Sequence, residues 1–193
     1  VVSTQSTGTM TQYKLVICGG GGVGKSCITL RFVQGKFYKS YDTTIEDQRE
    51  QFRKQISLPS GEQVMLNIWE TVGQDELGSV RDAYLSNGDG FVIVYATNSS
   101  ASYDQAQALR EHILQLKDNP SVPILFAGNK CDLKDRQVET VQAKQMASEN
   151  GCLFLECSAK DNTNIQQLFE DIAKKMVETA TAGKPKKKGC GSN

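Results

Sequence analysis

Residues 19–26 have the composition of a loop that binds phosphate. They read GGGGVGKS and match the pattern G-x-x-x-x-G-K-[ST], in which backbone N–H groups surround phosphate oxygens. Lys25 would reach the β and γ phosphates, and the hydroxyl of Ser26 would bind Mg²⁺. A plain glycine-rich turn would not need the Gly-Lys-Ser ending, so we predict a phosphate site. The predicted contacts come from Gly19, Gly20, Gly21, Gly22, Val23, Gly24, Lys25, Ser26 and Cys27.

A second group of polar residues could select the base of a nucleotide. The phosphate motif alone leaves ATP-using kinases and ATPases open. Asp132 lies in the string NKCD, and its carboxylate can accept hydrogen bonds from N1–H and the 2-amino group of guanine, a donor pair that adenine lacks. The wrong base would leave that carboxylate unpaired, so such a site discriminates strongly. The predicted base-binding residues are Asn129, Lys130, Asp132, Ser158, Ala159 and Lys160.

The elements that must position these residues alternate along the chain. Apolar, β-rich runs occupy residues 13–18, 64–69, 90–96, 123–128 and 152–157, and helix-length segments occupy 25–34, 100–118, 138–150 and 164–178. Residues 47–57 alternate and meet 62–69 through a short turn, which predicts an antiparallel hairpin. We therefore predict an α/β fold with a six-stranded, mostly parallel sheet, one antiparallel edge strand and about five flanking helices. Ligands of such sheets bind beyond the carboxyl ends of the strands, where both motifs fall.

Length and composition indicate one domain with two tails. The 193 residues predict a flexible leader over 1–10, a folded unit over 11–178 and a basic flexible tail over 179–193. Lysine plus arginine (22) balance aspartate plus glutamate (22), which gives no reason to expect a nucleic acid as partner. The six cysteines show no C-x-x-C spacing, which favours reduced thiols in a cytosolic protein.

Taken together, these motifs resemble those of the Ras subfamily of small GTPases. The resemblance rests on residues 19–26, 41–47, 73–74, 129–132 and 158–160, and it covers the whole folded unit in order. It implies a P-loop NTPase fold, the small G domain. It also implies a molecular switch that binds GTP or GDP with Mg²⁺, hydrolyses GTP to GDP and signals to effectors.

The resemblance also implies roles for individual residues. Thr44 would close on Mg²⁺ and the γ-phosphate, Tyr41 would cover the phosphates, and Phe37 would stack on the base. Gly73 would donate its N–H to the γ-phosphate, and Gln74 would orient the attacking water. The implied catalytic residues are Gln74, Lys25, Thr44 and Gly73, and the implied metal-binding residues are Ser26, Thr44 and Glu70.

Three residues depart from the family pattern in the segments that would contact Mg²⁺ and the γ-phosphate. Glu70 stands where the family has aspartate, so we expect Mg²⁺ to be bound more weakly or displaced. Val72 replaces a small alanine beside Gly73, and we expect slower hydrolysis. Thr43 replaces a proline and removes a restriction on φ. The alternative is therefore a hydrolysis-impaired GTP-binding scaffold, which Glu70 and Val72 would explain.

Partners and location follow from the resemblance and from the tail. The family implies three kinds of partner: an exchange factor, a GTPase-activating protein and effectors. We expect the protein itself to be a monomer. Lysines precede Cys190, as in a prenylation site, and would add attraction to an anionic membrane. The expected location is the cytosolic face of the plasma membrane or another membrane; otherwise the tail is solvated and the protein cytoplasmic. The expected effector surface is Tyr41, Asp42, Thr43, Thr44, Ile45, Glu46, Asp47, Gln48 and Arg49.

Overall fold

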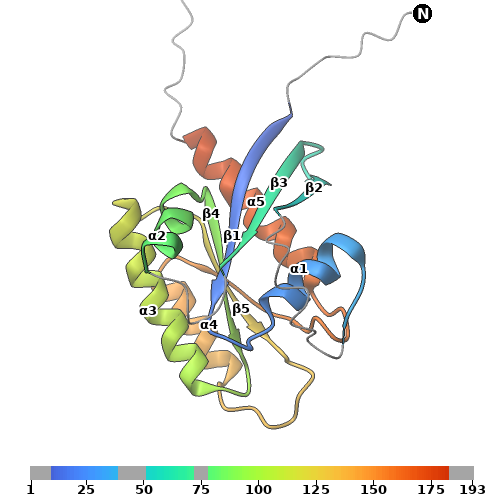
Figure 1. Cartoon of the computed structure of the whole chain (residues 1–193), viewed down its shortest axis with the longest axis vertical. Coiled ribbons are helices and arrows are strands. Elements are labelled where there is room, and N and C mark those ends of the chain that lie inside the picture. The colour runs from blue at the N-terminus through green and yellow to red at the C-terminus, as the bar shows by residue number, and fades with distance from the viewer. Residues whose placement is uncertain (1–9, 39–50, 72–77, 183–193) are drawn as a thin grey trace, which may run out of the picture.

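The centre of the protein is a six-stranded sheet with the strand order β2-β3-β1-β4-β5-β6. The computed structural model describes residues 10–38, 51–71 and 78–182, and the structural statements below concern these residues (Figure 1). β2 pairs with β3 in antiparallel orientation, and all other neighbours in the sheet pair in parallel. The strands are β1 (Thr11–Gly19), β2 (Phe52–Ser57), β3 (Gln63–Glu70), β4 (Gly90–Ala96), β5 (Ile124–Asn129) and β6 (Leu153–Glu156).

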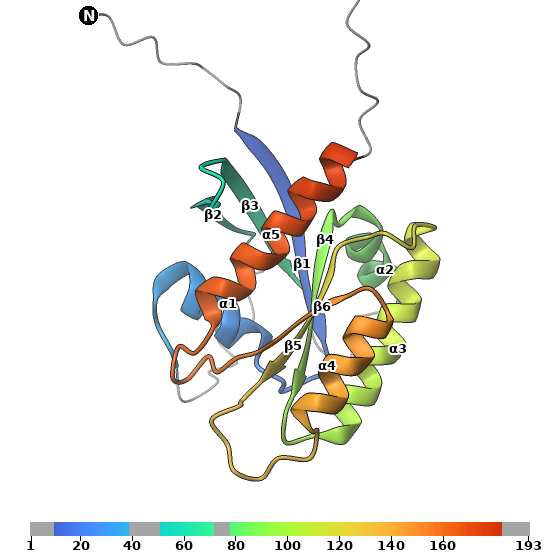
Figure 2. The same ribbon diagram turned by 180° about the vertical axis from the view of Figure 1, so that it is seen from behind.

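Five helices within the described residues cover both faces of the sheet. Leu15 and Ile17 of β1 pack in a hydrophobic cluster with α1 and α5, whereas Val16 and Cys18 pack with α2, α3 and α4. Figures 1 and 2 show these two layers from opposite sides. No helix in the described part of the chain is long and apolar enough to span a membrane. The helices are α1 (Lys25–Gln34), α2 (Gly78–Asn87), α3 (Ser100–Lys117), α4 (Thr140–Glu149) and α5 (Ile165–Ala182).

The sheet and its helices confirm the predicted fold class. All seven residues of β4 are buried, as expected for a strand of a parallel sheet that helices cover on both faces. The predicted hairpin joins β2 to β3 through residues 58–62, where the N–H of Leu58 donates to the carbonyl of Glu62 at 2.9 Å. Gly61 takes a φ of +84° in this turn, a conformation that side chains disfavour.

One helix and several element boundaries differ from the sequence-based expectation. α2 lay in no predicted segment, because its ten residues are mostly polar and Leu85 is the one fully buried side chain among those described in it. α5 continues through Ala182, four residues beyond the predicted end, since its alanines favour helix and Thr179 donates to the carbonyl of Lys175. α4 begins at Thr140 rather than 138, and β2 begins at Phe52, while residues 47–50 of that predicted strand lie outside the described residues.

Aromatic packing between α1 and α5 fixes the helix that follows the glycine-rich loop. The ring of Phe32 stacks on that of Phe169 with centroids 3.7 Å apart and planes inclined by 7°. Ile28, one turn closer to the loop, is fully buried. The first turn of α1 is thereby held at the edge of the sheet where β1 ends.

Candidate nucleotide-binding site

The loop between β1 and α1 requires glycine at both of its ends. Gly19 has a φ of +142°, and a Cβ there would lie 2.2 Å from the carbonyl oxygen of Val94. Gly24 has a φ of +97°, and a Cβ there would lie 2.3 Å from Nδ2 of Asn129. The missing side chains let the loop lie directly against β4 and β5, with its backbone groups available to a ligand.

Positive charge is concentrated where this loop enters α1. Gly24 precedes the helix and offers no side chain to cap its first N–H groups, which carry the positive end of the helix dipole. The Lys25 ammonium donates to the carbonyl oxygens of Gly19 at 3.1 Å and Gly20 at 2.8 Å. Burial lowers the pKa of Lys25, and the nearby Glu70 carboxylate acts in the opposite direction. This arrangement suits a phosphate group.

Ser26 and Glu70 meet directly at the start of α1 and the end of β3. The Ser26 hydroxyl donates to Oε2 of Glu70 at 2.6 Å, so the lone pairs of the hydroxyl oxygen remain free for a cation. Oε1 of Glu70 is buried and has no hydrogen-bond partner among the described residues. Hydroxyl and carboxylate oxygens are the ligands that Mg²⁺ prefers, so these two residues fit a magnesium ion. Because glutamate is one methylene longer than aspartate, the Glu70 carboxylate lies further along its side chain from the backbone of β3 than an aspartate carboxylate would.

Asn129, the last residue of β5, joins the phosphate loop to the loop after β6. Its side-chain amide donates from Nδ2 to the carbonyl oxygen of Val23 at 2.8 Å, and Oδ1 accepts from the N–H of Ala159 at 3.2 Å. Lys130 adds a second link, because its ammonium donates to the carbonyl oxygen of Gly22 at 2.8 Å. The predicted phosphate and base-binding segments therefore lie in direct contact.

The carboxylate of Asp132 is held in place by residues of the loop after β6. The Ser158 hydroxyl donates to Oδ1 at 2.7 Å, and the Lys160 ammonium lies 3.5 Å from Oδ2. Burial tends to raise the pKa of Asp132, but the hydrogen bonds from Ser158, the backbone and Lys160 outweigh it and lower the pKa overall. The group is therefore an ionised, oriented acceptor at neutral pH, as recognition of a guanine edge requires.

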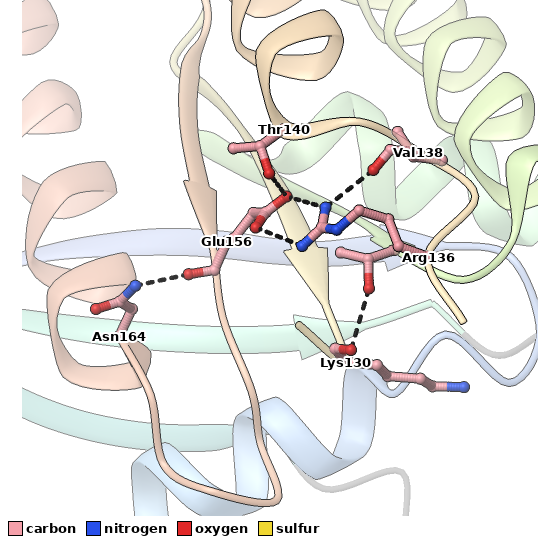
Figure 3. A network of polar contacts seen from close by, with 7 residues as sticks. Lys130, Arg136, Val138, Thr140, Glu156 and Asn164 are labelled. Carbon is pink, nitrogen blue, oxygen red and sulfur yellow. Dashed lines mark hydrogen bonds and ion pairs between the residues drawn. The ribbon is translucent and has the colours of Figure 1, made fainter. Parts of the chain in front are cut away.

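An ion pair that sequence reasoning missed holds the two base-binding segments together. Figure 3 shows the guanidinium of Arg136 donating to both carboxylate oxygens of Glu156, at 2.7 and 3.0 Å. The Thr140 hydroxyl donates to the same carboxylate at 2.9 Å, and Arg136 also donates to the carbonyl oxygen of Val138. Bidentate pairs of this kind are strong and geometrically specific.

Two hydrogen bonds to backbone carbonyls accompany this ion pair (Figure 3). The Asn164 amide donates to the carbonyl oxygen of Glu156 at 2.7 Å, and the Thr97 hydroxyl donates to that of Lys130 at 3.0 Å. The segments that follow β5 and β6 are thus tied to each other and to the end of β4. Twenty residues separate Arg136 from Glu156, so no local pattern indicates their pairing; only the adjacency of β5 and β6 could.

The structure brings together many, but not all, of the predicted site residues. Phe37 is partly buried against the core cluster that contains α1, and burial raises the pKa of the Cys27 thiol in the first turn of that helix. Tyr41, Thr44, Gly73 and Gln74, the effector surface over 41–49 and Cys190 lie outside the described residues. The residues that meet at the carboxyl edge of the sheet are 19–27, Glu70, Asn129, Lys130, Asp132, Ser158, Ala159 and Lys160.

Comparison with known protein families gives a match that spans most of the chain. The model of the Ras family matches residues 14–178, from the first half of β1 into α5. The matched region contains every loop of the candidate site.

The Arg136–Glu156 pair yields a stability prediction. Arg136→Ala leaves a partly buried carboxylate with the Thr140 hydroxyl as its remaining side-chain donor, and we expect the free energy of unfolding to fall by about 1.5–3 kcal/mol. Urea unfolding followed by circular dichroism measures this loss. Lys134→Ala, an exposed lysine in the same loop, serves as control and should change stability by less than about 0.5 kcal/mol. Equal losses in both variants would contradict a specific role of the pair.

Proposed function

The chain belongs to the Ras family, whose members are small GTPases that bind guanine nucleotides, and from this we propose that it is a switch that binds GTP or GDP with Mg²⁺ and hydrolyses GTP. The observation that best supports the proposal is the direct contact between two loops. Asn129 and Lys130 donate to the carbonyls of Val23 and Gly22, which puts an acceptor for guanine beside a loop suited to phosphate. The distance between base and phosphates in a nucleotide requires such a neighbouring pair of sites.

In the proposed switch, this chain's own residues divide the work between binding and timing. Lys25 and the N–H groups at the start of α1 hold the phosphates, and Asp132 reads the base. Bound Mg²⁺ would neutralise charge on the phosphates. By the family resemblance, Thr44 and Gly73 contact the γ-phosphate and Gln74 orients water, so loss of that phosphate releases both loops. Exchange factors, activating proteins and effectors would act on these loops, with effectors on residues 41–49.

A hydrolysis-impaired binding module is the second candidate, and the Ser26–Glu70 contact favours it. Glu70 brings its longer side chain to the hydroxyl that would bind Mg²⁺, at 2.6 Å. Magnesium tolerates little deviation from octahedral geometry, so a carboxylate carried one methylene further from the backbone would hold the ion less tightly than the family's aspartate. Val72 would add a β-branched side chain where the second switch turns toward the γ-phosphate. Such a protein would retain GTP and act as a lasting scaffold.

Single-turnover hydrolysis of radiolabelled GTP distinguishes the switch from the scaffold. For a switch, the wild-type protein cleaves bound GTP, and Gln74→Leu slows cleavage by about 100-fold because the attacking water loses its orienting group. Val72→Ala should accelerate cleavage by relieving crowding. Retention of uncleaved GTP by the wild type, with cleavage restored by Glu70→Asp, would instead establish the scaffold.

The Mg²⁺ requirement of nucleotide retention tests the role of Glu70. Removing one methylene in Glu70→Asp should let a cation be held with better geometry, so the free Mg²⁺ concentration that halves GDP release should fall by about tenfold. Release of a fluorescent GDP in buffers of fixed free Mg²⁺ measures this. Glu62→Asp makes the same change at an exposed glutamate in the β2–β3 turn and should behave as wild type. An unchanged Mg²⁺ midpoint in Glu70→Asp would refute the proposal that Glu70 weakens the binding of Mg²⁺.

For the tail beyond the described residues, we propose attachment to an anionic membrane through its lysines and a lipid on Cys190. One lipid chain binds weakly, and each lysine near the surface adds about 1 kcal/mol. Mass spectrometry of the protein from its native cells should show a prenyl group on Cys190. An unmodified thiol there would leave only electrostatic contact with the membrane.

A further inference from the structure

Arg31, in the last turn of α1, donates to three backbone carbonyls from two different segments of the chain. Its Nε donates to the carbonyl oxygen of Ala159 at 2.8 Å, and Nη2 donates to that of Lys160 at 2.8 Å. Nη1 donates to the carbonyl oxygen of Gly35 at 2.9 Å, and the guanidinium carbon lies 5.7 Å from the ring centroid of Phe37. One side chain therefore touches both the loop after β6 and the segment that leaves α1.

Among the residues that the structure describes, Arg31 is the one hydrogen-bond donor to each of these three carbonyls. Gly35 ends α1 in a left-handed conformation, and its N–H donates back to Arg31, while its own carbonyl has left the helix ladder. Ala159 and Lys160 lie in the turn between β6 and α5, and Arg31 is the one donor to their carbonyls among the described residues. Hydrogen bonds from a charged donor to such groups contribute more than neutral ones.

Ala159 and Lys160, whose carbonyls Arg31 binds, directly follow Ser158, which orients Asp132. Ser158 donates to the Asp132 carboxylate through its hydroxyl, and that hydroxyl also accepts from the N–H of Asp161. Residues 158–161 thus form a tight turn whose outer carbonyls are fixed by Arg31 and whose inner hydroxyl fixes Asp132. A shift of the turn would move the acceptor that reads the base.

We propose that Arg31 is a positioning residue for guanine recognition, which holds the 158–160 turn in place and couples it to residues 35–38. This inference rests on the proposed function. The coupling has a mechanical consequence: a partner that pulls on the segment after α1 also loosens the base-binding turn and speeds nucleotide release. A lysine could not replace the arginine fully, because three separate carbonyls require the planar fork of the guanidinium.

Release of fluorescent GDP and IDP from the full chain in the presence of Mg²⁺ tests this inference. IDP lacks the 2-amino group that Asp132 would accept, so the wild type should release IDP faster than GDP. Arg31→Gln should release GDP about tenfold faster than wild type but IDP only about threefold faster, because the misplaced Asp132 no longer distinguishes the two bases. Arg31→Lys, which retains the charge and one contact, should fall between Arg31→Gln and wild type.

Arg110→Gln is the matched control, since Arg110 of α3 also donates to a loop carbonyl, that of Asn150, at 3.2 Å. It should leave both release rates unchanged. An unchanged GDP rate in Arg31→Gln, or equal acceleration of GDP and IDP, would overturn the inference and leave Arg31 as a structural residue. Wild-type protein that retains neither nucleotide would instead overturn the proposed function, and the inference with it.

Discussion

The buried amide of Asn129 is the contact on which the arrangement of the site depends. It is 2% exposed, and it donates to Val23 of the phosphate loop while accepting from Ala159 of the base-binding turn. A buried amide left without partners would cost several kcal/mol, so the three segments must keep this mutual position. Gly24 belongs to the same constraint, because a Cβ there would collide with the amide nitrogen.

Besides Asn129, two arginines hold the turn after β6. Arg136 acts through Glu156, at the point where β6 ends, and Arg31 acts through the carbonyls of Ala159 and Lys160. The first contact joins the turn to the segment that carries Asp132, and the second joins it to the segment that leaves α1. These contacts fix the backbone of the short loops that carry the predicted base-binding residues.

Sequence reasoning predicted every strand and all helices except α2, but not the side-chain contacts that hold the loops of the candidate site together. Buried runs and the spacing of helix-length segments predicted the six-stranded, mostly parallel sheet and its antiparallel edge strand correctly, because their signals lie within a few neighbouring residues. Arg31, Arg136 and Glu156 were missed, since Arg31 binds Ala159 and Lys160 across 128 and 129 residues and Arg136 binds Glu156 across 20. The acceptors of Arg31 are also backbone carbonyls, which no side-chain pattern marks. α2 was missed because its buried face is small. The roles assigned to Thr44, Gly73 and Gln74 stay predictions.

Calorimetric titration of the purified chain with GDP and with ADP, in the presence of Mg²⁺, tests the central claim most directly. The claim is that Asp132, oriented by Ser158, selects guanine beside the phosphate loop. We predict binding of GDP at least about a hundredfold tighter than that of ADP, and loss of most of this difference in Asp132→Ala. Equal or tighter binding of ADP by the wild type would contradict the account and would favour an ATP-using phosphotransferase on the same loop.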